Sequence, residues 1–434
     1  MSANAGRIAA GLLLLAGTVR GDDWPSWRGP AGNGLSAEKS APLEWDAGRN
    51  VKWKAPLPQP GNGSPIVSNG RVFVTCPEDL NGRRRSLYCF DRATGRTLWV
   101  RTVENRRRTD EGTGRPRYRH ETNYPSSSTP AADGARVVVW HDSAGLFCYD
   151  FAGKELWSRD LGEFYHLWGH GGSPILHDGK VVLNCSPGKD VFLVALDAAT
   201  GKTLWKTGEP LELDPKRAAE GFGDKNPAGK WVGSWCTPTV VRVGDREQIL
   251  CAQPTRLVAY DPKDGAILWW CGGLRGRGDL AYSSPVVAGD VVVYIGGFSG
   301  PGFGVRLGGT GDVTETHRLW YKEENPQSIG SGVFLDGHVY LPFENRLECL
   351  DPKTGRSLWQ DRGVGGGYWG SIVYAAGRCY VTARNGTTAV FKPSSERFEL
   401  LAANRLGEPS NSTPAVSNGE IFIRTFQHVY CIGE

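Results

Sequence analysis

The side chains best suited to hold a ligand are aromatic, and several share one position of an internal repeat. Trp235, Tyr282 and Trp369 each stand three residues before the point where a repeat unit opens. Aromatic faces with a few polar groups are typical of a concave small-ligand site, and they also suit sugar rings or a peptide. The alternative is that these rings merely fill a channel. The candidate ligand-binding residues are Trp235, Tyr282, Trp369, Tyr368, Trp168, His170, His120, Glu121 and Asn411.

Motifs for covalent or metal-assisted catalysis are absent from the sequence. It contains no Gly-x-Ser-x-Gly turn and no Cys-x-x-Cys or His-Glu-x-x-His signature. The glycine-rich segment 296–311 lacks the Lys-Ser/Thr ending of a phosphate loop, and we interpret it as a distorted hairpin. His166 and His170 have helical spacing but stand in a loop-like segment, which favours hydrogen bonding over metal binding. We therefore predict no catalytic residue and no metal ligand.

A repeated phrase indicates which elements position these side chains. Its clearest copy, at residues 196–205, reads Leu-Asp-Ala-Ala-Thr-Gly-Lys-Thr-Leu-Trp, with close copies at 90–99 and 350–359. The Asp accepts hydrogen bonds from backbone N–H groups that follow it, and the Gly takes the left-handed conformation that closes the turn. Residues alternate before and after the turn, as they do in strands. The repeat tryptophans are Trp53, Trp99, Trp157, Trp205, Trp269, Trp320 and Trp359.

The number of units and the two chain ends predict the architecture. The last unit has only three strands before the chain ends, and residues 51–55 can supply the fourth. Ring closure of this kind removes exposed strand edges. We therefore predict an all-β, eight-bladed β-propeller of four-stranded antiparallel blades, closed by an N-terminal strand that completes the C-terminal blade. A two-sheet sandwich array is the alternative. Units open at Pro65, Pro130, Pro174, Pro238, Pro285 and Pro414, with Gly332 and Ser371 aligned to the residue before two missing prolines.

The same alignment predicts which side chains surround one mouth of the channel. They stand at the start of each innermost strand and are Asn62, Ser127, Gly171, Trp235, Tyr282, Gly330, Trp369 and Asn411. The aromatic members form an arc, and the others are small or polar. The loop between the first two blades adds His120, Glu121, Asn123 and Tyr124.

Bulk properties narrow the class of protein. The chain has 434 residues and a net charge of +4. Two of its basic residues, Arg7 and Arg20, fall in a segment that resembles an export signal. A nearly neutral mature chain gives no case for nucleic acid as a partner. We expect a signal peptide at 1–21, an extension at 22–49 and the propeller at 50–434. No cysteine follows the apolar run and no apolar segment is long enough to span a bilayer, so we expect a periplasmic or secreted monomer.

The ten cysteines are expected to be mostly buried thiols. Cys89, Cys148, Cys349 and Cys431 share one repeat position, which alanine fills in other units. A site that accepts either residue is small and buried. Cys76 and Cys89, within one predicted blade, are the pair that would most readily form a disulfide.

The repeat resembles the tryptophan-docking repeat of pyrroloquinoline-quinone-type propellers. That group includes quinone-dependent alcohol dehydrogenases and the lipoprotein scaffold of the outer-membrane barrel-assembly machinery. Residues 24–30, Trp-Pro-Ser-Trp-Arg-Gly-Pro, are similar to the start of many secreted bacterial members without an assigned activity. For the quinone enzymes the resemblance implies an adjacent Cys-Cys pair, an Asp base and a Glu/Asn set around calcium. No two cysteines are adjacent here; the nearest approach is Trp270-Cys271-Gly272.

Pyrroloquinoline quinone with calcium is therefore disfavoured, and no cofactor is predicted. We expect a non-catalytic exported propeller that binds or scaffolds a protein or envelope polymer through its channel-mouth loops. The alternatives are a quinone-dependent dehydrogenase-like protein and a carbohydrate-binding protein that uses the aromatic mouth.

Overall fold

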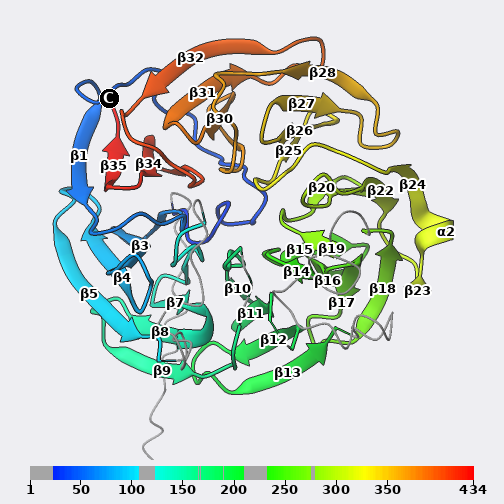
Figure 1. Ribbon diagram of the computed structural model, residues 1–434, viewed down its shortest axis with the longest axis horizontal. Helices are drawn as coiled ribbons and strands as arrows, with labels where there is room; N and C mark the ends of the chain where they lie inside the picture. The colour runs from blue at the N-terminus through cyan, green and yellow to red at the C-terminus, as the bar shows by residue number, and fades with distance from the viewer. Residues whose placement is uncertain are drawn as a thin grey trace, which may run out of the picture.

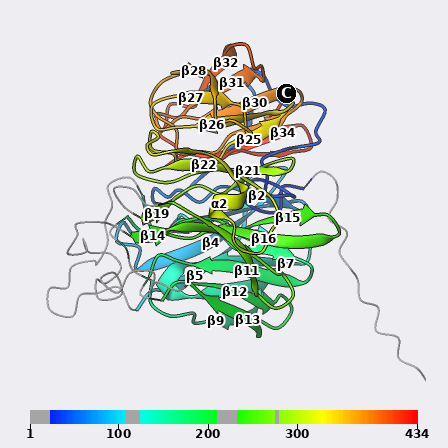
Figure 2. The same ribbon diagram turned by 90° about the vertical axis from the view of Figure 1, so that its right-hand side faces the viewer.

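A computed structural model describes residues 23–106, 123–164, 166, 168–188, 190–209, 232–274 and 279–434. Small antiparallel sheets stand in a ring around a central channel (Figure 1), and the view from the side shows them packed against one another (Figure 2). The predicted eight-bladed propeller is confirmed. The expected signal segment lies outside the described residues. Within them, no helix has the length and apolar character needed to cross a membrane.

Each of the first four blades runs outward from a short innermost strand. Blade 1 comprises β2 (Ile66–Ser68), β3 (Arg71–Pro77), β4 (Arg84–Asp91) and β5 (Thr97–Glu104). Blade 2 comprises β6 (Ala131–Ala132), β7 (Arg136–Trp140), β8 (Leu146–Asp150) and β9 (Glu155–Arg159), with the 3-10 turn η1 (Asp142–Ala144). Blade 3 comprises β10 (Ile175–His177), β11 (Lys180–Cys185), β12 (Phe192–Asp197) and β13 (Thr203–Gly208). Blade 4 comprises β15 (Thr239–Val243), β16 (Arg246–Ala252), β17 (Arg256–Tyr260) and β18 (Ile267–Gly272).

The remaining blades repeat this plan. Blade 5 comprises β20 (Val286–Ala288), β21 (Val291–Ile295), β22 (Gly302–Arg306) and β24 (Arg318–Lys322). Blade 6 comprises β25 (Val333–Leu335), β26 (His338–Pro342), β27 (Leu347–Leu350) and β28 (Ser357–Asp361). Blade 7 comprises β29 (Val373–Ala375), β30 (Arg378–Thr382), β31 (Thr387–Lys392) and β32 (Glu399–Arg405). Blade 8 comprises β33 (Ala415–Ser417), β34 (Glu420–Arg424), β35 (His428–Ile432) and β1 (Val51–Pro56).

Four short elements depart from the four-strand plan. The insertion before β24 adds a two-residue strand, β23 (Gly311–Asp312), to the outer edge of blade 4, followed by a single helical turn, α2 (Thr314–His317). At the channel mouth, β14 (Val232–Ser234) pairs in parallel with β19 (Asp279–Ala281). The glycine-rich segment is the β21–β22 hairpin and its continuation, as expected.

The two ends of the chain share blade 8, as predicted. Strand β1 pairs antiparallel with β35, and Trp53 lies opposite Cys431 in the register. Figure 1 shows the blue β1 beside the red β35. Because β1 supplies the outermost strand of this blade, main-chain hydrogen bonds between the two ends of the chain close the ring.

In most blades the repeat tryptophan donates a hydrogen bond to the next blade. The indole N–H of Trp53 donates to the carbonyl of Arg92 at 2.8 Å, and that of Trp157 donates to Ala198 at 3.0 Å. Both acceptors follow the Asp of the neighbouring blade's turn. In that turn, Gly95 has φ +70° and lies so close to the Trp53 ring that a Cβ atom would meet it at 2.5 Å. The turn therefore needs glycine for its backbone angle and for its contact with the indole.

Blade 4 is an exception to this arrangement. Trp269 donates instead to Gln248 Oε1 of its own blade at 2.9 Å. The next blade has the 307–317 insertion where the docking turn would be, so the usual acceptor is missing there. In blade 7 the docking position is held by Ala402, which pairs with Val390 as Trp359 pairs with Cys349 in blade 6. Leu400, which the sequence alignment places there, lies two residues earlier, before the bulge.

A belt of hydroxyl groups closes the ring on the channel side. In every blade the residue before the opening position is Ser or Thr, and its hydroxyl accepts a hydrogen bond from the backbone N–H of the corresponding residue in the preceding blade. The eight distances lie between 2.8 and 3.1 Å. The belt runs through Ser64, Thr129, Ser173, Thr237, Ser284, Ser331, Ser371 and Thr413 before returning to Ser64.

The belt corrects the sequence alignment of blade 6. Ser331 is the belt residue of that blade, so Gly332 occupies the place of the missing proline rather than the residue before it. The mouth position of this blade is consequently Ile329 and not Gly330. Gly330 lies against the backbone of Gly370 in the next blade.

The cysteines are buried free thiols within the described residues, as expected. No bridge joins Cys76 to Cys89, because the antiparallel register places Cys76 opposite Ser86 and Cys89 opposite Phe73. The shared repeat position is fully buried, and Cys431 lies there beneath Trp53.

Candidate functional site

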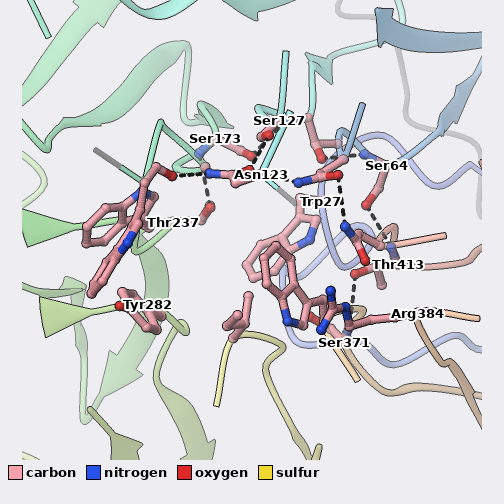
Figure 3. Close-up of a pocket in the computed structure, with 18 of the residues that line it drawn as sticks. Trp27, Ser64, Asn123, Ser127, Ser173, Thr237, Tyr282, Ser371, Arg384 and Thr413 are labelled. Atoms are coloured by element: carbon pink, nitrogen blue, oxygen red, sulfur yellow. Dashed lines mark hydrogen bonds between the residues drawn. The ribbon is translucent and has the colours of Figure 1, made fainter. Parts of the chain in front are cut away.

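A cavity of about 380 Å³ lies at the channel mouth, between the ring of mouth residues and the hydroxyl belt. We call it the axial pocket. Figure 3 shows side chains from most blades converging on it. Its described lining consists of aromatic rings, neutral polar groups and one ion pair: Trp27, Asn62, Ser64, Asn123, Ser127, Thr129, Trp168, Gly171, Ser173, Trp235, Thr237, Tyr282, Phe298, Gln327, Ile329, Glu344, Trp369, Ser371, Arg384, Asn411 and Thr413.

One wall of the axial pocket is aromatic and is positioned by the parallel β14–β19 pair. Trp235 directly follows β14 and Tyr282 directly follows β19, so the pairing brings their rings to 5.1 Å in an edge-to-face arrangement. Trp168 adds a third ring 5.9 Å from Tyr282, and Phe298 lies 5.2 Å from Trp168. Edge-to-face contacts of this kind hold aromatic groups in place. The wall is therefore a fixed apolar surface.

A second wall, on blades 6 and 7, combines an aromatic ring with the only charged side chains in the described lining. The guanidinium of Arg384 lies 4.9 Å from the centre of the Trp369 ring, within the range of a cation–π contact. The same group forms an ion pair of 3.4 Å with Glu344. Both partners are partly exposed, so the pair contributes little to stability. Its main consequence is that the two charges cancel in the pocket.

Neutral amides make up the third side. Asn62 donates to Asn123 at 2.8 Å, and Asn411 donates to Asn62 at 3.2 Å. Ser127 donates to Asn123 at 2.6 Å. Figure 3 draws these bonds as a connected series. Amide groups carry both donors and acceptors, so this side of the pocket can bind hydroxyl or amide groups of a ligand.

The N-terminal extension crosses the channel on the far side of the belt. The carbonyl of Pro25 accepts from Ala132 in blade 2 at 2.8 Å, while the Arg28 side chain donates to the carbonyl of Gly332 in blade 6. Blades 2 and 6 face each other across a ring of eight. The segment therefore spans the full width of the channel (Figure 1, dark blue) and places Trp27 in the lining of the axial pocket.

Arg28 is the buried anchor of this crossing segment. Its guanidinium also donates to the carbonyl of Asn33 at 2.9 Å, and burial lowers its pKa to about 9. Farther along, the N–H of Tyr374 in blade 7 donates to Gly34 at 2.8 Å. Trp27 was not predicted as a pocket residue, since nothing in the extension repeats the pattern of the blades.

The structure brings together some of the predicted site residues and separates others. Trp235, Tyr282, Trp369, Trp168 and Asn411 line the axial pocket. His120 and Glu121 lie outside the described residues.

Tyr368 and His170 lie apart from the axial pocket. Tyr368 is fully buried, and its hydroxyl donates to Arg362 at 3.1 Å and accepts from Val364 at 2.9 Å. His170 is buried with its ring 5.9 Å from Trp140, and a ring nitrogen lies 3.1 Å from the Phe164 carbonyl. Both are neighbours in sequence of lining residues, but the backbone turns their side chains into the blades.

The pocket residues that the sequence did not indicate come mostly from turns between strands. Phe298 lies in the β21–β22 turn and has φ +50°, Glu344 lies in the β26–β27 turn, and Arg384 lies in the β30–β31 turn. These turns differ in length between blades, so the repeat gives no alignment for them. Gln327 and Ile329 stand before β25. The one-residue misalignment of blade 6 assigned the mouth position to Gly330 and so passed over them.

The ionisable side chains in the described lining of the axial pocket are Tyr282, Glu344 and Arg384. Within the described part of the chain, no three His, Cys, Asp or Glu side chains gather as metal ligands. Burial raises the pKa of Tyr282 well above its usual value, so its hydroxyl stays protonated and can donate a hydrogen bond. The pocket is suited to binding through aromatic faces and neutral hydrogen bonds.

These features define a tryptophan-docked, eight-bladed propeller with a ligand-sized pocket on its axis. The family model described as "Outer membrane protein assembly factor BamB" matches residues 41–109, 83–361 and 343–431, and the chain belongs to this family of pyrroloquinoline-quinone-like propellers.

Two curated relatives are each named polyvinylalcohol dehydrogenase. The protein from Pseudomonas sp. is 27% identical over 240 residues, which is 50% of this chain and 34% of the relative. The protein from Sphingopyxis sp. (strain 113P3) is 25% identical over 277 residues, which is 57% of this chain and 39% of the relative. The matched part thus spans little more than a third of the length of these relatives.

Solved structures share the fold at low sequence identity. Quinohemoprotein alcohol dehydrogenase from Comamonas testosteroni superposes with a TM-score of 0.67 at 16% identity, covering 95% of this chain and 81% of that one. BamB from Moraxella catarrhalis gives a TM-score of 0.56 at 14% identity, covering 88% and 97%. A europium-containing methanol dehydrogenase gives 0.67 at 12% identity, covering 96% and 98%. Dehydrogenases and a barrel-assembly protein thus share this architecture, which leaves the function to be argued from the site.

Proposed function

We propose that this protein is a non-catalytic binding module of the cell envelope and that its axial pocket holds a neutral, hydroxyl-rich ligand, such as a unit of an envelope polysaccharide. One observation carries the proposal: aromatic rings from separate blades, Trp235 with Tyr282 and Trp369, line one pocket whose two charges, Arg384 and Glu344, cancel. Aromatic faces pack against the C–H faces of sugar rings. The amides of Asn62, Asn123 and Asn411 bind hydroxyl groups.

The residues of the axial pocket fit pyrroloquinoline quinone poorly. That cofactor carries several carboxylates, whereas Arg384 is the sole Lys or Arg in the described lining and is already paired with Glu344. The ten cysteines lie outside the described lining. We therefore assign no step of a reaction to this group.

A second candidate function, a quinone-dependent dehydrogenase activity, is favoured by the names of the two curated relatives. Those relatives are named for a hydroxyl-bearing polymer, which agrees with the class of ligand proposed here. The test is to mix purified protein with pyrroloquinoline quinone and calcium, record the visible spectrum, and assay dye reduction with alcohols. A bound quinone band together with alcohol-dependent dye reduction would replace the binding function with this one.

The binding function is tested by calorimetric titration with cello-, malto- and chito-oligosaccharides and with polyvinyl alcohol. We expect at least one of these to bind, and Trp369→Ala to weaken binding by about tenfold, or about 1.4 kcal/mol. The matched control is Trp270→Ala, which removes a half-buried tryptophan on β18 in the outer part of blade 4. If no neutral polymer binds, or if both substitutions weaken binding equally, the proposal is wrong.

Location and partners follow from the same proposal. The family description and the barrel-assembly neighbour are consistent with an envelope protein, and we propose that the protein acts there as a monomer. Cell fractionation followed by sedimentation of the purified protein tests both statements. A cytoplasmic fraction or a stable dimer would contradict them.

A further inference from the structure

A second hollow adjoins the axial pocket at the surfaces of blades 7 and 8. It has a volume of about 310 Å³, and we call it the lateral hollow. Its polar floor is formed by Arg384, Asn385 and Asn411, and its apolar side by Tyr124, Pro409 and Phe426. Arg384 and Asn411 line both hollows, so the two are neighbours that share one partition.

The lateral hollow repeats the chemistry of the axial pocket on a smaller scale. Tyr124 and Phe426 lie 5.0 Å apart in an edge-to-face arrangement, although Tyr124 precedes blade 2 and Phe426 belongs to blade 8. The charge at the partition is again neutral, because Arg384 is paired with Glu344. An aromatic pair beside amide groups thus lies next to the axial pocket.

The far end of the axial pocket is occupied by protein. Residues 25–28 cross the channel from blade 2 to blade 6 beyond the belt, and Trp27 lies in the pocket lining. A chain that enters the pocket therefore meets Trp27 rather than a through-channel. The part of that polymer chain outside the axial pocket lies beside the lateral hollow, on the mouth side.

We propose that the two hollows together bind one end of a linear polymer of neutral, hydroxyl-rich units. The terminal unit lies in the axial pocket above Trp27, and the next unit crosses the partition of Arg384 and Asn411 into the lateral hollow, against Tyr124 and Phe426. This inference rests on the proposed function, and it adds that the site takes a chain end and that a second unit strengthens binding.

The first test compares oligomers of increasing length. Binding of cello-, malto- and chito-oligosaccharides of one to four units is measured by calorimetry. For the series that binds, affinity should rise roughly 3- to 10-fold from one unit to two, as expected for an added aromatic contact, and then level off. Phe426→Ala should remove this gain and leave the affinity for the single unit unchanged. The control is Tyr321→Ala, which removes an exposed aromatic ring on the outer strand β24.

The outcomes separate the two proposals. If a single unit binds as tightly as the longer oligomers, or if Phe426→Ala keeps the gain, the lateral hollow is not a subsite and this inference is overturned while the binding function stands. If no oligomer binds at any length, the binding function itself fails and this inference fails with it. The unchanged affinity of Phe426→Ala for the single unit shows that the variant is folded.

The second test addresses the chain end. The binding oligomer is capped with a bulky group at its reducing end or, separately, at its non-reducing end. One cap should abolish binding, since that end must fit above Trp27, and the other should be tolerated. If both capped oligomers bind as well as the free one, the chain lies across the mouth and the end-binding arrangement is wrong.

Discussion

The outer frame and the channel mouth of this propeller are built from the same repeat, but they use it in opposite ways. In the frame, the same residue makes the same contact from blade to blade: the indole N–H of Trp99, Trp205 and Trp320 in each case bonds a carbonyl of the following blade at 2.8–3.1 Å. At the mouth, one aligned position carries eight side chains that range from glycine to tryptophan: Asn62, Ser127, Gly171, Trp235, Tyr282, Ile329, Trp369 and Asn411.

Within one repeat, the recurring positions therefore hold the blades together, and the variable mouth position shapes the axial pocket. The tryptophan contact recurs at the joints whose following blade has the docking turn, and it is lost after blade 4, where Trp269 bonds Gln248 of its own blade. A position that faces the shared axis has no such requirement, and its large residues are gathered on blades 4, 5 and 7. The axial pocket is therefore asymmetric, although the ring that carries it is nearly symmetric.

The largest expected effect in the frame is at its closing joint. Trp53→Ala removes the ring that packs on Gly95 and the hydrogen bond to Arg92, at the blade that joins the two chain ends. We expect a loss of about 3–5 kcal/mol of unfolding free energy, as for other buried aromatic residues, measured by urea denaturation. Lys54→Ala, on the exposed side of the same strand, should leave stability within about 0.5 kcal/mol. Equal stability of the two variants would contradict closure through β1.

The sequence predicted the frame well because its residues recur. The Asp-x-x-Thr-Gly turn of blades 1, 3 and 6 and the recurring tryptophan identify most blades, and the three-strand last unit with residues 51–55 identifies the joint. It predicted Trp235, Tyr282 and Trp369 for the same reason, since they occupy an aligned position.

The rest of the mouth could not be predicted from recurrence. Phe298 and Arg384 come from turns of unequal length, and Trp27 comes from a segment outside the repeat. Gly330 was wrongly placed because the proline that marks the alignment is missing in blade 6. Tyr368 shows a further limit: it directly precedes Trp369, yet alternation along the chain directs its side chain into the core.

A smaller effect is expected at a buried histidine between blades 1 and 2. His141 is fully buried beside Arg85 and Asp142, and burial lowers its pKa to about 3. Since the unfolded chain takes up this proton near pH 6.5 and the folded chain does not, stability is retained above that pH and lost as the pH falls toward 3. The loss is about 1.4 kcal/mol per pH unit, or about 2 kcal/mol at pH 5.

Urea denaturation of His141→Phe between pH 7 and 5 checks this value. Between pH 7 and 5, the unfolding free energy of His141→Phe should fall by about 2 kcal/mol less than that of the wild type. That of His338→Gln, at a half-buried position on β26, should fall as much as that of the wild type. If both variants follow the wild-type curve, the acid sensitivity of the ring arises elsewhere.

The hydroxyl belt allows a direct comparison of the two regions. Its hydrogen bonds recur in every blade, as the contacts of the frame do, but some of its residues line the axial pocket. Ser64 and Ser331 each accept one N–H bond from the preceding blade, at 2.9 and 2.8 Å, but Ser64 lines the axial pocket and Ser331 is not part of its lining. Ser64→Ala and Ser331→Ala should each cost about 1–2 kcal/mol of unfolding free energy, since each leaves a buried N–H without its acceptor. The affinity for a bound oligosaccharide should be unchanged in Ser331→Ala. If Ser64→Ala loses affinity beyond its loss of stability, the belt contributes directly to the pocket; if it loses stability alone, the belt acts solely as a fastening between blades.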